Sequence, residues 1–109
     1  MLPRRDRIDG ATFSRLPTGG QRYVRSTVQV RHVPAACQQA AVVVSRKVST
    51  KAVERNRLRR VLYGVLERVW SDLPTGYYLV YVQPTAKGER DVRVSAELKS
   101  ILGEMVKAR

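Results

Sequence analysis

The sequence predicts an α+β domain in which a small mixed sheet carries helices on one face. Two continuous apolar runs, 40–44 and 77–82, are typical of buried central strands. The segment between the two runs has the strongest helical periodicity in the chain. A strand, helix, strand series of this kind favours a parallel pair of strands joined by a crossover helix. The predicted order is α-β-β-α-β-α, with room for an extra short strand over 21–25.

The first elements in chain order are a basic arm and a short helix. Residues 1–8 are charged and lack apolar periodicity, so we expect a flexible arm there. Asp9 is suited to cap a helix over 10–16, because its carboxylate can accept a hydrogen bond from a free backbone N–H group. Phe13 and Leu16 would then share one face of that helix.

The remaining elements follow from alternation and from helical stripes. Residues 23–33 alternate at period two, which predicts a strand with one wet, basic face. Ser49 or Thr50 is the expected N-cap of the long helix, whose apolar stripe begins at Leu58. A second apolar stripe predicts a final helix that starts near Ser95.

Length and charge narrow the class of protein. A chain of 109 residues builds one modest core, so we expect a single domain over 1–109. The formal net charge of +12 favours a polyanionic partner, because cations that neutralise phosphates release counterions. Residues 1–60 carry 14 Lys and Arg against 3 Asp and Glu, whereas 61–109 carry 7 against 6. With no apolar run long enough for a bilayer, we expect a cytoplasmic protein without a membrane role.

Catalytic and metal-ligating patterns are sparse in this sequence. Cys37 is the only cysteine and His32 the only histidine, which excludes an intrachain disulfide and a cysteine zinc site. Several acids are scattered and are interpreted as caps or surface charges: Asp6, Asp9, Glu54 and Glu67. A self-sufficient nuclease is therefore disfavoured. Charge alone leaves a ribosomal or other structural RNA-binding protein open.

The most informative segment is 45–60, where Lys and Arg dominate and Glu54 is the only acid. Like charges three or four residues apart on a helix repel by about 0.2–0.5 kcal/mol per pair, which argues against a stabilising role. Phosphates would relieve that repulsion, while asparagine can hydrogen-bond a base edge or a ribose hydroxyl. The candidate RNA-binding residues are Arg46, Lys47, Lys51, Arg55, Asn56, Arg57, Arg59 and Arg60.

Within this segment, Arg55-Asn56-Arg57-Leu58-Arg59-Arg60 resembles the signature of the bacterial ribonuclease P protein family, R-N-R-hydrophobic-K/R-R. The preceding strand end at 45–48 is part of the resemblance. The similarity extends to Phe13, to the turn glycine Gly19, to the strand at 77–82 and to the final helix at 95–106. It therefore covers essentially the whole chain.

The resemblance implies an α/β sandwich whose motif helix makes an unusual left-handed crossover between parallel strands. It also implies that the motif helix and the adjoining strand end face a catalytic RNA. A cleft between the sheet and the first and last helices would take the single-stranded 5′ leader of precursor tRNA. Hydrolysis would be performed by Mg²⁺ held mainly by the RNA, with the protein an accessory subunit that needs no obligate protein partner.

Four residues are expected at the leader cleft: Phe13, Asn56, Arg60 and Tyr63. Two departures from the family pattern bear on it. Tyr63 stands where the family commonly has a basic residue, and Val30 falls near the place of a strand aromatic that often lines the cleft. The tyrosines of the strand at 77–82 are expected to pack in the core rather than stack on bases.

Overall fold

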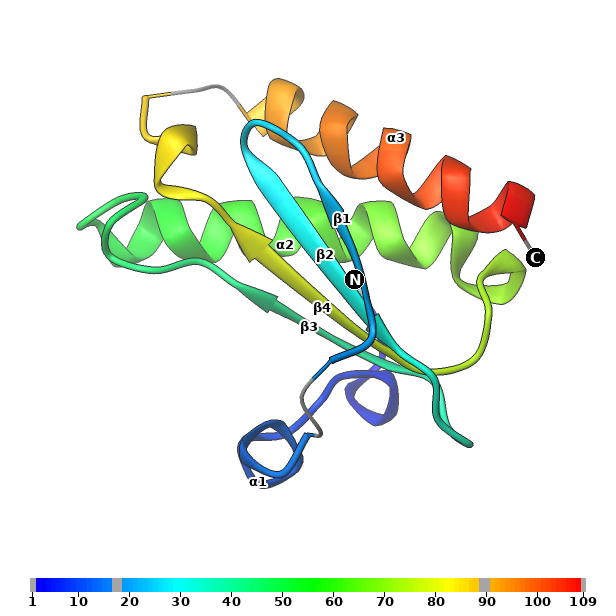
Figure 1. The fold of residues 1–109 in the computed structure, drawn as a ribbon. Helices are drawn as coiled ribbons and strands as arrows, with labels where there is room; N and C mark the ends of the chain where they lie inside the picture. Colours follow the sequence, from blue (N-terminus) through cyan, green and yellow to red (C-terminus); the bar gives the residue numbers. More distant parts are fainter. Residues whose placement is uncertain (1, 17–18, 89–90, 109) are drawn as a thin grey trace.

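The computed structural model describes residues 2–16, 19–88 and 91–108 and confirms the predicted order of elements (Figure 1). The helices and strands are α1 (Gly10–Ser14), β1 (Gln21–Val24), β2 (Val28–Val33), β3 (Gln39–Val43), α2 (Ala52–Val69), β4 (Tyr77–Val82) and α3 (Asp91–Ala108). The described residues also form three short 3₁₀ turns: Arg4–Asp6, Trp70–Asp72 and Pro84–Ala86. None of the described helices is both long and apolar enough to cross a membrane.

The four strands form one mixed sheet in the order β1-β2-β4-β3. β1 pairs with β2 and β2 with β4 in antiparallel fashion, while β3 and β4 are parallel. The parallel pair is joined through α2, as the strand, helix, strand series predicts. The extra short strand expected over 21–25 is β1.

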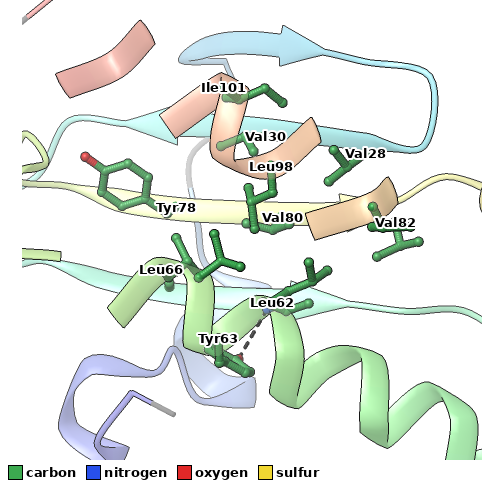
Figure 2. Close-up of a cluster of buried hydrophobic side chains, with 14 of the residues drawn as sticks. Val28, Val30, Leu62, Tyr63, Leu66, Tyr78, Val80, Val82, Leu98 and Ile101 are labelled. Atoms are coloured by element: carbon green, nitrogen blue, oxygen red, sulfur yellow. Dashed lines mark hydrogen bonds between the residues drawn. The ribbon is translucent and has the colours of Figure 1, made fainter. Parts of the chain in front are cut away.

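The main core lies between one face of the sheet and the two long helices (Figure 2). Alternate residues of β2 and β4 point to this face, because successive side chains of a strand lie on opposite sides. The largest fully buried side chains here are Val28, Val30, Tyr78, Val80, Leu62, Leu66, Val94, Leu98, Ile101, Leu102 and Met105. Val30 therefore faces α2 and α3, away from the other face of the sheet.

The opposite face of the sheet, here called the open face, carries α1 at one end (Figure 1). Tyr77 points away from the main core, and it lines a hollow together with Ala11, Thr12, Arg15 and Leu16 of the α1 region. The expectation that all helices cover one face is therefore wrong for α1. The expected cleft between the sheet and both the first and last helices needs the same correction, because α1 and α3 lie on opposite sides.

The N-terminal segment differs from the expected flexible arm. Leu2 is only 2% exposed and belongs to the main core. The backbone N–H of Ile8 donates to the carbonyl of Ala40 at 2.8 Å, and the Gln39 side chain donates to the carbonyl of Arg5 at 2.9 Å. The free edge of β3 thus supplies hydrogen-bond partners that local charge patterning does not reveal.

Both long helices begin elsewhere than predicted. The N-cap of α2 is Lys51, which has no side-chain cap bond, in place of Ser49 or Thr50. The Ser49 hydroxyl instead accepts from the Lys51 N–H at 3.2 Å and donates to Glu54 at 2.6 Å. α3 begins at Asp91 rather than near Ser95, because its apolar stripe already includes the buried Val94.

Candidate RNA interface

The basic segment projects from the body of the protein as its apolar stripe predicts. Leu58 is the first buried residue of α2. Before and around it, the exposed candidates are Arg46, Lys47, Lys51, Asn56, Arg57 and Arg60, whereas Arg55 and Arg59 are half-buried. Most of the predicted RNA-binding side chains therefore lie on one exposed end of the molecule, formed by the end of β3 and the first turns of α2. We call these eight residues the motif surface.

Hydrogen bonds divide the motif surface into two groups. Arg55 donates to the carbonyl of Ser49 at 3.0 Å, and Arg57 donates to the Asp91 carboxylate at 3.1 Å. Asn56 accepts a hydrogen bond from Arg59. These contacts fasten the start of α2 to its own loop and to α3.

The other group has no such internal partner. The side chains of Arg46, Lys47, Lys51 and Arg60 make no hydrogen bond or ion pair with another described residue. Lys51 interacts with the Glu54 carboxylate through charge alone. An exposed cation without a hydrogen-bonded or ion-paired partner loses little when it meets a phosphate, so these four are the side chains best placed for that contact.

The open face includes the wet, basic side expected of residues 23–33, and it carries a second set of binding candidates that the sequence analysis did not single out. Arg22 of β1 is paired in register with Arg31 of β2, so two cations stand side by side on neighbouring strands. Two residues before Arg31 on β2, Gln29 is paired with Tyr81 of β4. Tyr81 is also paired with Val43 of β3. All five residues point to the open face and line a hollow of about 370 Å³.

Arg31 gives this hollow a hydrogen-bond donor, and Tyr81 gives it a half-buried aromatic ring. The Nε atom of Arg31 is buried and has no acceptor among the described residues. Tyr81 is half-buried on the open face, so the expectation that it packs in the core is wrong, as it is for Tyr77. The expectation is right for Tyr78, which is fully buried. Period-two alternation within the apolar run was the signal that separates these tyrosines.

The four expected leader-cleft residues do not meet in one place. Phe13 is 38% exposed on α1, on the open-face side of the sheet. Asn56 and Arg60 are exposed on α2, which covers the other face. Tyr63 is only 8% exposed, and its hydroxyl accepts a hydrogen bond from the backbone N–H of Val42 at 3.2 Å (Figure 2). The structure therefore gives the Tyr63 ring a place in the core.

The acids of the described residues do not gather into a metal site. Across 2–16, 19–88 and 91–108, no three His, Cys, Asp or Glu side chains lie close enough to hold an ion together. The residues present thus do not fit a protein-held Mg²⁺, and no chemical step is assigned to one.

Taken with the sheet topology, the exposed motif surface and the open face define a small RNA-binding protein of the α+β class. The family model for ribonuclease P matches residues 2–106, and the chain belongs to the bacterial ribonuclease P protein family.

Curated relatives support the same family. A ribonuclease P protein component from Synechococcus sp. (strain RCC307) is 32% identical over 118 residues, covering 94% of this chain and 93% of the relative. One from Xylella fastidiosa (strain Temecula1 / ATCC 700964) is 36% identical over 84 residues, covering 76% of this chain. The match spans 62% of the Xylella protein's length.

Solved structures share the fold. The RNase P protein of Staphylococcus aureus superposes with a TM-score of 0.78 at 20% identity, covering 90% of this chain and 93% of that one. The RNase P protein of Thermotoga maritima gives a TM-score of 0.75 at 21% identity, covering 92% of this chain and 97% of that one. The four-stranded mixed sheet and its helices are therefore the fold of these proteins.

Proposed function

We propose that this chain is the protein subunit of a bacterial ribonuclease P, an endoribonuclease that removes the 5′ leader from precursor tRNA. In this proposal the chain binds a catalytic RNA through the motif surface and the leader through the open face. The single observation that carries it is the motif Arg55 to Arg60, displayed on an exposed helix end in a chain of this family.

The motif surface is suited to a folded RNA because its free cations are spread over a helix and a strand end. Arg46 and Lys47 follow β3, whereas Lys51 is the N-cap of α2 and Arg60 lies in its third turn. Side chains from two elements can reach phosphates on different strands of a folded RNA. Asn56 adds a neutral group that can bond a 2′-hydroxyl, which distinguishes RNA from DNA.

The open face is suited to a single strand because it combines cations with an aromatic ring. Arg22 and Arg31 can each neutralise a backbone phosphate, while the half-buried Tyr81 offers a ring for base stacking. Neighbouring strands lie about 4.8 Å apart, so the arginine pair and the tyrosine are within the span of a few nucleotides. Phe13 on α1 can extend the surface that binds the single strand. This assignment replaces the expected cleft between α1 and α3.

The chemical step falls to the RNA partner in this proposal. In this family hydrolysis depends on Mg²⁺ that would be held mainly by the RNA, and the protein acts as an accessory. What the chain's own residues contribute is affinity and orientation: the motif surface fixes the catalytic RNA, and the open face holds the leader beside it. No catalytic residue is therefore assigned to the chain.

Recovery of bound RNA tests the proposal. The tagged chain is expressed in its own bacterial host, purified at moderate salt, and its RNA is sequenced. We expect one abundant structured RNA that cleaves precursor tRNA at the mature 5′ end. Recovery of ribosomal RNA alone would instead support a structural ribosomal protein, and would overturn the assignment.

A further inference from the structure

The N-terminal segment, the edge of β3 and α2 surround a hollow of about 460 Å³ that lies outside the motif surface and the open face. Its lining includes Arg4, Arg5 and Arg7 from the N-terminal segment and Tyr63 from α2. Figure 2 shows Tyr63 on the side of α2 that faces the N-terminal ribbon. A contribution to fold stability does not explain why three arginines line one hollow.

Arginines outnumber acids by three to one among the residues that line this hollow. Asp9 is the one acid in the lining, and its carboxylate already accepts from the Thr12 N–H at 2.7 Å as the cap of α1. That hydrogen bond holds the pKa of Asp9 below its usual value. The side chains of Arg4, Arg5 and Arg7 have no hydrogen bond or ion pair with another described residue. The hollow is therefore electropositive.

Arg7 is held in place by its backbone. It forms a parallel bridge with Ala40, so its side chain points to the same face as Ala40, toward α2. The Nε atom of Arg7 is buried, and no described residue supplies an acceptor for it. A buried charged donor without an acceptor is unfavourable, and an anion in the hollow would satisfy it.

Tyr63 supplies a second donor and connects the hollow to the motif surface. Its hydroxyl accepts from Val42, which leaves its own hydrogen without an acceptor among the described residues. Tyr63 follows Arg60 by three residues and Asn56 by seven, so the three share one stripe of α2. At 1.5 Å per residue that stripe is about 10 Å long, a distance that a few nucleotides of one RNA can cover.

We propose that this hollow binds a backbone phosphate of the same RNA that the motif surface contacts. Arg7 would donate from a fixed position, Arg4 and Arg5 would close over the phosphate, and the Tyr63 hydroxyl would add a neutral hydrogen bond. An RNA phosphodiester fits better than a free ion because the hollow continues the stripe of Asn56 and Arg60. The inference rests on the proposed function, since it needs the motif surface to bind RNA.

The salt dependence of RNA binding tests this site. The probe is the ribonuclease P RNA of the same genome, transcribed in vitro, with affinity measured over a range of salt concentrations. Arg7→Gln should reduce the steepness of the log–log plot by about 0.7–0.9, the effect of one lost phosphate contact. Arg7→Lys should retain the slope. Lys99→Gln removes the same charge from the exposed face of α3 and should leave the slope unchanged.

The outcomes separate this inference from the proposed function. If the wild-type chain binds the RNA, and Arg60→Gln lowers the slope but Arg7→Gln does not, the hollow is not a phosphate site and the proposed function stands. If the wild-type chain does not bind this RNA, both fall. A thermal stabilisation by inorganic phosphate that Arg7→Gln abolishes, with an unchanged RNA slope, would assign the hollow to a free ion and overturn the RNA site.

Discussion

Glu97 of α3 holds the turn between β1 and β2 through Thr27. Its carboxylate accepts from the Thr27 backbone N–H at 2.7 Å and from the Thr27 hydroxyl at 2.8 Å. Thr27 is only 1% exposed, so both donors would be unsatisfied without this partner. The contact fastens the hairpin that carries Arg22 and Arg31 to the helical layer, and so links the stability of the fold to the position of the open-face cations.

Glu97→Ala should lower the free energy of unfolding by about 1–3 kcal/mol, because it leaves two buried donors without an acceptor. Urea unfolding followed by circular dichroism measures the change. The matched control is Glu104→Ala on the same helix, which removes an exposed ion pair with Arg25. Pairs of that kind contribute about 0–1 kcal/mol. Equal losses for the two variants would contradict the role given to Thr27.

The same contact makes stability depend on pH. The Thr27 N–H is the main cause that holds the pKa of Glu97 below the usual value of a glutamate, with smaller help from the Thr27 hydroxyl and Arg93. A carboxyl with a lowered folded-state pKa stabilises the fold above its unfolded pKa and loses that effect as pH falls through the folded value. We expect the wild type to lose more stability than Glu97→Gln between about pH 5 and pH 3. Parallel curves would contradict this.

Tyr63→Phe should also destabilise the fold. The substitution removes the hydroxyl that accepts a hydrogen bond from the backbone N–H of Val42. Val42 is buried even though β3 is an edge strand of the sheet. An unsatisfied buried N–H costs about 1–3 kcal/mol. Tyr81→Phe on the open face is the control and should change unfolding by much less. A Tyr63→Phe variant as stable as the wild type would show that this hydrogen bond is dispensable.

Tyr81→Ala should weaken binding of precursor tRNA to the reconstituted holoenzyme. Stacking of one base on an aromatic ring contributes about 1–3 kcal/mol, which corresponds to a loss of roughly 5-fold to 150-fold. Mature tRNA has no leader, so its binding should be nearly unchanged. Tyr81→Phe keeps the ring and should keep the affinity. Equal losses for precursor and mature tRNA would assign Tyr81 to folding rather than to the leader.

Phe13→Ala tests whether the leader-binding surface of the open face extends to α1. If the leader reaches α1, the loss should appear only with leaders several nucleotides long and should vanish with a short leader. A lowered melting temperature without a leader-dependent loss would show that Phe13 only packs beside Leu16. Comparison of leader lengths in one binding assay separates the two results.

Much of the fold was predictable because it depends on local patterns. The stripe that begins at Leu58, the cap at Asp9 and the apolar runs each gave an element in the right place. The exposure of Asn56 and Arg60 follows from the same stripe, since side chains opposite a buried face must point outward.

The basic side of β2 was predicted, but the full open face could not be, because it depends on which strands become neighbours. Arg22 and Arg31 stand side by side only through the β1 and β2 register, and Tyr81 joins them only because β4 inserts between β2 and β3. The ordered N-terminal segment could not be predicted for the same reason, since it depends on hydrogen bonds to the edge of β3, which is distant in sequence. Non-local pairing of this kind leaves no local sequence pattern.

Reconstitution of cleavage from purified components is the decisive experiment for the proposed function. The purified, RNA-free chain, the ribonuclease P RNA of the same genome and a precursor tRNA are combined with Mg²⁺, and each component is omitted in turn. We expect no cleavage by the chain alone. With the RNA, the chain should sharpen cleavage at the mature 5′ end and raise affinity for precursor over mature tRNA. Cleavage by the RNA-free chain, or an RNA reaction that the chain leaves unchanged, would rule out the proposed role as an accessory subunit.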